Sequence, residues 1–165
     1  MAIAFDRPKI VADTIDDLRR IFQAVNDFSR QAERVTGLTG SQLWAVKVIG
    51  EYKSIKVSDL AKCMYLHPAT VVGILDRLEL QGLVQRIRSK TDRRVVVLEL
   101  TASGEKMLET SPDVAQGLLA HGLEKIAEDK LLRIHEGMSE FVRILGVEGI
   151  PPRLILSNEV NIKNP

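Results

Sequence analysis

The sequence predicts a mainly α-helical protein with one small β-hairpin. Apolar residues recur at helical spacing over most of the chain, residues typical of helix caps mark where helices begin, and two short alternating segments surround a basic loop. With 165 residues, 45% hydrophobic and 27% charged, the chain has the size and composition of an ordinary globular protein. We therefore expect a single domain over residues 1–165.

The first predicted helix spans residues 10–36. Its apolar residues follow helical spacing, with acidic residues near its start and basic residues near its end, as the helix dipole favours. Its apolar face is wide for a helix at the end of a small domain, so we expect it to pack against a second subunit as well as its own core. Residues 1–9 carry no pattern beyond a proline, which predicts a loose arm.

Two helices are predicted next, and the first has a complete start signal. Thr39 is placed as the N-cap of a helix over residues 40–52, and Gln42 completes a capping box three residues later. Ser58 is then predicted to cap a brief helix over residues 59–64.

A further helix begins at Pro68, because proline fits the first turn of a helix but not its interior. His67 is its predicted N-cap, and Gly82 ends it in the left-handed conformation. One side of this helix is predicted to be buried, and its members are spaced i, i+3, i+4 and i+7: Val71, Ile74, Leu75 and Leu78.

Two strands follow over residues 84–88 and 95–100, joined by a basic loop. We name residues 86–94 the wing; it holds five basic residues and one acid, which gives a net charge of +4 in a chain whose total is only +1. The order helix, turn, helix, strand, basic loop, strand is that of a winged helix-turn-helix. We therefore place a DNA-binding core, the reading head, over residues 38–108.

The C-terminal third is predicted to be helical and to end in a tail. Thr101 caps the next helix, and Pro112 lies within its apolar pattern. We expect a kink there, the alternative being a second helix capped by Ser111. A last helix covers residues 128–145, and glycines and prolines leave residues 146–165 as an extended tail.

The outward side of the helix after Pro68 is small and weakly polar. Thr70 is its only predicted outward hydroxyl and Arg77 its only outward base, while Ala69 and Val72 are placed to contact thymine methyl groups. Direct hydrogen-bonded readout of bases from this helix is therefore expected to be modest.

The wing is expected to supply much of the affinity, because guanidinium groups suit phosphates and narrow minor grooves. We expect Arg93 to enter the minor groove and Asp92 to pair with Arg94, which holds the shape of the hairpin. Backbone amides at the helix starts near Ser58 and Pro68 add phosphate contacts. The predicted DNA-binding residues are Ser58, His67, Pro68, Ala69, Thr70, Val72, Arg77, Arg88, Ser89, Lys90, Thr91, Arg93 and Arg94.

Several short motifs carry a family resemblance: Ser58-Asp59-Leu60-Ala61, Leu66-His67-Pro68-Ala69-Thr70-Val71, Leu75-Asp76-Arg77-Leu78-Glu79, Gly82-Leu83-Val84, Asp92-Arg93-Arg94 and Leu100-Thr101-Ala102-Ser103-Gly104. As a set they resemble the multiple-antibiotic-resistance regulator (MarR) family. The resemblance implies a homodimer whose dimerisation helices lie in residues 10–36 and 111–145, a palindromic operator, and often a small aromatic or phenolic effector that releases DNA. The sequence departs from the family at Val72 and Gly73, where many members have threonine and a longer polar or basic residue.

We therefore expect a homodimer that binds double-stranded DNA in a sequence-specific manner and regulates transcription, as a repressor relieved by an effector. The alternative is a winged-helix protein-interaction module without DNA binding, which the charge of the wing disfavours. An enzyme is not expected, because no motif groups a nucleophile, a base and an orienting residue.

Other side chains are weaker candidates for function. Phe22, Phe28 and Trp44 are candidates for an effector pocket, although aromatic residues at helical spacing more often form core. Cys63, the single cysteine, is either an oxidation sensor or, more ordinarily, a semi-buried side chain. The histidines lack ligand spacing with it, so neither a metal nor a cofactor is expected.

The sequence shows neither a basic segment followed by an apolar leader nor an apolar run of about 18 residues. A cytoplasmic location and no membrane association are expected.

Overall fold

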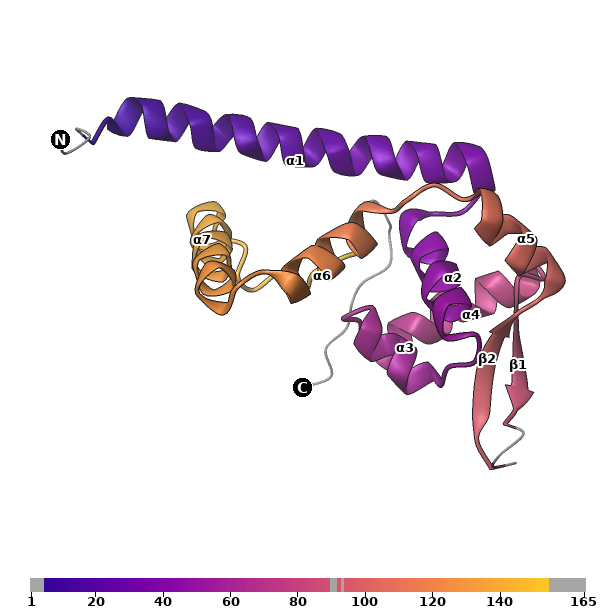
Figure 1. The fold of residues 1–165 in the computed structure, drawn as a ribbon. Coiled ribbons are helices and arrows are strands. Elements are labelled where there is room, and N and C mark those ends of the chain that lie inside the picture. The colour runs from indigo at the N-terminus through magenta and orange to yellow at the C-terminus, as the bar shows by residue number, and fades with distance from the viewer. Residues whose placement is uncertain (1–4, 90–91, 93, 155–165) are drawn as a thin grey trace.

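A computed structural model of the protein describes residues 5–89, 92 and 94–154. It is mainly helical with one two-stranded antiparallel hairpin, which confirms the predicted fold class (Figure 1). The elements are α1 (Arg7–Thr36), α2 (Gly40–Tyr52), α3 (Val57–Cys63), α4 (Pro68–Leu80), β1 (Val84–Arg88), β2 (Val96–Leu100), α5 (Ala102–Thr110), α6 (Ala115–Lys125) and α7 (Glu128–Leu145).

The reading head is built around α4. The four residues of its predicted apolar stripe are each 0% exposed, and they pack in one hydrophobic core with side chains from α2, α3 and the hairpin. Burying these side chains is the main stabilising contribution available to so small a unit. The largest fully buried members of this core are Leu38, Leu43, Ile49, Leu60, Met64, Ile74, Leu75, Leu78 and Leu98.

The predicted capping signals are mostly confirmed. The Gln42 amide donates to Thr39 Oγ1 at 3.4 Å and the Thr39 amide donates to Gln42 Oε1 at 3.0 Å, which completes the capping box. His67 Nδ1 accepts from the Ala69 amide at 3.3 Å. The prediction for Ser58 is wrong: α3 starts one residue earlier, its N-cap is Lys56, and it has no side-chain cap bond.

The hairpin is anchored at its base rather than only through its own strands. Its strands pair in the register Val84 with Leu100. Ile55, from the loop before α3, adds a short bridge to Leu98 through bonds of 3.1 and 2.7 Å. Thr101 donates from its hydroxyl to the Gly82 carbonyl at 2.5 Å and caps α5. The wing therefore extends from a fixed platform.

The expected kink at Pro112 is wrong, because the helix ends instead. α5 stops at Thr110, Ser111 adopts an extended conformation (φ −75°, ψ 138°), and α6 starts after Val114. A proline disfavours helical geometry at the residue before it, which is Ser111. That serine does not cap α6; its hydroxyl donates to the Leu108 carbonyl at the end of α5.

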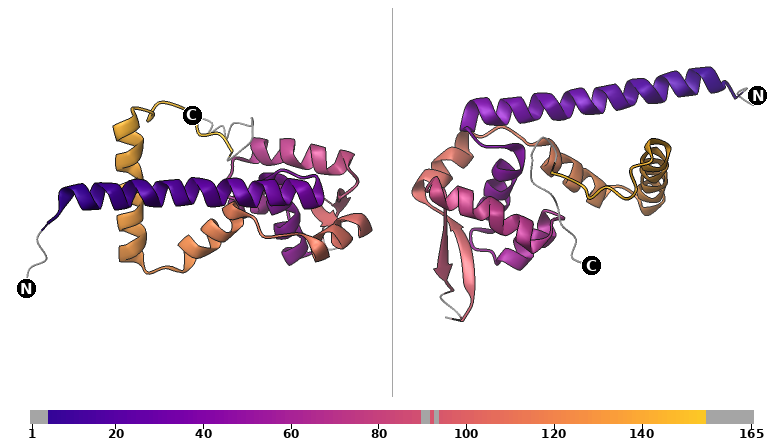
Figure 2. Two further views of the ribbon diagram at one scale, coloured as in Figure 1. Left: turned by 90° about the horizontal axis from the view of Figure 1, so that it is seen from above. Right: turned by 180° about the vertical axis from the view of Figure 1, so that it is seen from behind.

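The remaining helices, α1, α6 and α7, form a frame beside the reading head. α1 packs against α2 and α6, and seen from above it crosses over α7 (Figure 2). It starts at Arg7 and not at residue 10, because Asp6 caps it by accepting from the Lys9 amide at 3.2 Å. None of the 18 residues of α7, all of which the structure describes, is buried.

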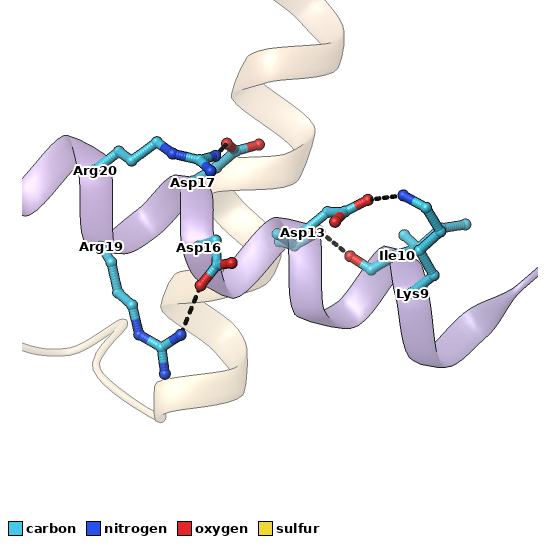
Figure 3. A network of polar contacts seen from close by, with 8 residues as sticks. Lys9, Ile10, Asp13, Asp16, Asp17, Arg19 and Arg20 are labelled. Carbon is cyan, nitrogen blue, oxygen red and sulfur yellow. Dashed lines mark hydrogen bonds and ion pairs between the residues drawn. The ribbon is translucent and has the colours of Figure 1, made fainter.

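The N-terminal half of α1 carries three ion pairs within the helix. Figure 3 shows Lys9 bonded to Asp13 at 2.6 Å, and the pairs Arg19–Asp16 and Arg20–Asp17 at 2.7 Å each. These exposed pairs three or four residues apart add modestly to helix stability.

The described part of the tail, residues 146–154, forms no helix and turns back toward the reading head. Gly146 (φ 66°) ends α7, and the Ile150 amide donates to the Val147 carbonyl at 3.0 Å in the turn that follows. Leu154 is only 8% exposed and joins the core of the reading head. Along the described chain, no helix combines the length and apolar character needed to cross a membrane.

Candidate nucleic-acid interface

The side of α4 that faces away from the core carries most of the residues predicted there. Pro68, Ala69 and Arg77 are exposed, and Val72 is 39% exposed. Thr70 is a correction, because it is 8% exposed and not outward. It lies four residues before Ile74, at the edge of the buried arc, so the wide contact of α4 with the core covers it.

The turn at the tip of the hairpin is shaped by Asp92. Its carboxylate accepts from the backbone amide of Arg94 at 2.9 Å, and its carbonyl accepts from the Val95 amide at the same distance. The predicted pairing of Asp92 with Arg94 therefore takes the form of a bond to the backbone. Arg88 and Arg94 are exposed and Ser89 is half-buried, while Lys90, Thr91 and Arg93 lie outside the described residues.

Arg86 has a role that the sequence interpretation missed. From β1, its guanidinium donates to Asp76 Oδ1 at 2.9 Å and also bonds Glu79, both on α4. The Arg86 and Glu79 side chains are 31% and 27% exposed, so their bond is partly shielded from water, whereas Asp76 is 58% exposed. Two acids three residues apart on one helix were the available signal, but only the fold brings Arg86 to them.

This bridge changes how the charge of the wing is used. Arg86 counts toward the basic cluster in the sequence, yet its charge is committed to two carboxylates of α4. The other bases of the wing are Arg88, Lys90, Arg93 and Arg94, and of these the structure describes Arg88 and Arg94, both exposed. The bridge also holds β1 beside α4, so the hairpin and the exposed side of α4 are presented together.

Two predicted phosphate contacts near helix starts occupy different environments. Ser58 is an exposed residue in the first turn of α3. The His67 ring caps α4, as predicted.

A cavity of about 510 Å³ lies between the reading head and the frame. It is mainly apolar, and Trp44 lines it as predicted, but neither Phe22 nor Phe28 is among its described lining residues. Phe22 is 66% exposed on α1. The walls come from α2, the α3–α4 turn, α6, α7 and the tail: Ser41, Trp44, Met64, Tyr65, Leu66, Gln116, Leu119, Ala120, Leu123, Glu124, Leu131, Pro152, Arg153 and Leu154.

Two polar features border this cavity. The Gln116 amide has both its nitrogen and its oxygen buried, without a hydrogen-bond partner among the residues that the structure describes. Tyr65, in the α3–α4 turn, adopts the left-handed conformation (φ 52°) and donates its hydroxyl to Glu124 of α6, which raises the pKa of the tyrosine. This bond joins the reading head to the frame.

Cys63 is half-buried, and its thiol donates to the Tyr52 hydroxyl at 3.7 Å. That contact is the main cause of a raised pKa at Tyr52. Within the described residues, histidine, cysteine and acidic side chains form no group of three or more that could hold a metal ion.

Comparison with known proteins places the chain in a family. The family model described as MarR family matches residues 38–96. The HTH-type transcriptional repressor MdtR of Bacillus subtilis (strain 168) is 28% identical over 125 residues, which are 76% of this chain and 81% of the relative.

Solved structures agree with this placement. A MepR-like protein complexed with pseudoligands is 30% identical, with a TM-score of 0.52, over 81% of this chain and 96% of that one. A MarR family protein from Bacillus stearothermophilus is 25% identical, with a TM-score of 0.53, over 86% of this chain and 99% of that one. The fold and the basic hairpin are those of a winged helix-turn-helix protein. More specifically, the chain belongs to the MarR family of transcriptional regulators.

Because Arg86 is paired within the protein, we expect its substitution to change the affinity for DNA but not the salt dependence of binding. Arg86→Gln is expected to weaken binding to a selected duplex about tenfold, because it loosens the hairpin from α4 and leaves two acids unpaired. The slope of log affinity against log salt should stay unchanged, because Arg86 neutralises no phosphate. The matched variant Arg88→Gln, on the same strand, should lower the slope by about one unit. Equal losses of slope in both variants would contradict this role.

Proposed function

We propose that this regulator binds double-stranded DNA in a sequence-specific manner as a homodimer and controls transcription by occupying a promoter. The observation that carries the proposal is the Arg86 bridge, which holds a basic hairpin beside the exposed side of α4. A helix fits the major groove, and a basic loop beside it reaches the adjacent backbone or minor groove. Repression is the sign we propose, because the relative MdtR is named a transcriptional repressor.

The proposed division of labour follows the chemistry of each surface. Pro68, Ala69, Val72 and Arg77 of α4 face the major groove, where apolar groups contact thymine methyls. The wing contacts phosphates and the minor groove. The residues of the wing that make these contacts are Arg88, Ser89, Lys90, Thr91, Arg93 and Arg94. Ser58 and His67, at the starts of α3 and α4, lie beside the DNA backbone. Thr70 is not included, because its side chain is buried.

The homodimer is supported by the apolar surface of the frame. On α1, Val11 and Phe22 are 54% and 66% exposed, and on α7, Leu132 and Met138 are 54% and 50% exposed. Apolar surface spread over two neighbouring helices marks an interaction site, and a two-fold pair of chains would remove it from water. Phe22 then has a role in this interface rather than in a pocket. A two-fold dimer implies a palindromic operator.

We propose that the cavity beside Trp44 binds a small aromatic or phenolic effector. Its volume is in the usual range for ligand pockets, and the buried Gln116 amide offers a donor and an acceptor to a ligand hydroxyl or carboxyl group. The cavity borders both head and frame, so an occupant that alters their contact changes the spacing of the two reading heads. The similar MepR-like protein was solved with pseudoligands.

We propose that the protein has no catalytic role and that it acts in the cytoplasm, where a regulator of transcription meets its DNA. The alternative function, a protein-interaction module without DNA binding, gains no support from the relatives, which are named as transcriptional regulators.

A substitution at the tip of the wing tests its proposed contact with DNA. Arg93→Ala is expected to lower affinity at all duplexes and to flatten the salt dependence by about one unit of slope, because one phosphate-neutralising charge is lost. Titrations at several salt concentrations measure both quantities. A slope equal to that of the wild type would contradict the assignment.

A substitution on α7 tests the proposed dimer. Met138→Glu places a charge in the apolar surface of α7 and is expected to give monomers in light scattering and to abolish operator binding at the same protein concentration. Ser139→Glu adds the same charge on the polar side of α7, which Glu136 and Arg143 share. That control is expected to remain dimeric. A dimeric Met138→Glu protein would exclude α7 from the interface.

A ligand titration tests the proposed effector site. Trp44 is the single tryptophan, so occupancy of the cavity by phenol or benzoate is expected to quench the fluorescence of the protein. Gln116→Leu keeps the shape but removes the amide, and should weaken quenching by these ligands about tenfold. Quenching that is equal in both proteins would place the ligand elsewhere.

A further inference from the structure

Nothing within the protein itself explains why position 73 of α4 is a glycine. Gly73 lies in the interior of this 13-residue helix, where glycine is a poor helix former compared with alanine. A Cβ atom added to Gly73 meets no described atom of the protein within 4 Å, and its φ is not in the left-handed region. Neither crowding nor backbone conformation in the free protein therefore requires glycine.

Other glycines of the reading head show what such a requirement looks like. A Cβ at Gly104 would strike the Leu83 carbonyl oxygen, and Gly82 has a φ of 69° that side chains rarely adopt. Both have a reason inside the fold. At Gly73, which is half-buried, the space that a side chain would fill is open.

The surroundings of Gly73 belong to the proposed DNA-facing side. Ala69 lies one helical turn before it and is exposed, and the neighbouring Val72 is 39% exposed. Asp76, three residues later, is bonded to Arg86 of the wing at 2.9 Å. Its charge is thus partly compensated on a surface that approaches phosphates.

We infer that Gly73 is a specificity-determining residue, whose missing side chain lets the backbone of α4 lie close to the major-groove edge of the bases. This inference rests on the proposed DNA-binding function. Close approach brings the methyl groups of Val72 onto the 5-methyl groups of thymine, the apolar feature that the major groove presents. The helix then recognises its site by close fit and methyl contacts. A longer polar side chain at position 73 would keep the helix away from the bases.

A single substitution separates this role from a structural one. Gly73→Ala is expected to raise the Tm of the free protein by about 2–4 °C, because alanine favours the helix and meets no clash. It should weaken binding to the selected operator about tenfold and leave binding to unrelated duplex unchanged. A glycine needed for folding would show the opposite sign in Tm.

Gly137→Ala is the matched control. Gly137 is also interior to a helix with open space around it, and it lies on α7 between the polar residues Arg133 and Glu140. Its substitution should raise the Tm similarly and leave operator affinity unchanged.

Operators with uracil in place of thymine test the contact itself. The wild type should lose about fourfold in affinity for each contacted methyl group removed, the value of one buried methyl. Val72→Ala and Gly73→Ala should both lack this sensitivity. The inference is overturned if Gly73→Ala binds the operator as the wild type does, lowers the Tm, or keeps the full response to uracil. A wild-type protein that binds no selected duplex would instead overturn the proposed function.

Discussion

The burial of one side of α4 determines how the rest of the reading head is arranged. Val71, Ile74, Leu75 and Leu78 are completely removed from water, and rotating the helix about its axis would expose them at a cost of several kcal/mol. The opposite side is therefore fixed toward solvent. The cap at His67 sets where the helix starts and Gly82 sets where it ends, so the same few residues define which side chains can meet DNA.

The hairpin adds charge to that surface, but not all of its charge is directed outward. Arg86 is held between Asp76 and Glu79, so it connects the wing to α4 rather than to a phosphate. The modest polarity of α4 and the concentration of basic groups in the wing then divide the work of recognition. Under the function that we propose, affinity depends mainly on the charge of the wing, and discrimination depends on the fit of the small, apolar outer surface of α4.

Local signals in the sequence were enough to predict much of this arrangement. The capping box at Thr39, the proline at the first turn of α4 and the buried stripe depend on residues close together in the chain. The Arg86 bridge, the return of Leu154 to the core and the burial of the Gln116 amide depend on contacts between distant segments, which the periodicity of one segment cannot reveal. The prediction that Thr70 points outward is wrong for a different reason. The buried side of α4 is wider than the four-residue stripe from which the outward side was inferred.

The frame leaves apolar surface in contact with water when the chain is alone, since α7 buries none of its described residues. A second copy would cover it and place two reading heads on one duplex. Hydroxyl-radical footprinting of the selected operator, with the stoichiometry of the complex, tests this most directly. We expect two chains per duplex and two protected half-sites whose centres lie about 34 Å, or a multiple of that helical repeat, apart. One chain per duplex with a single protected half-site would contradict it.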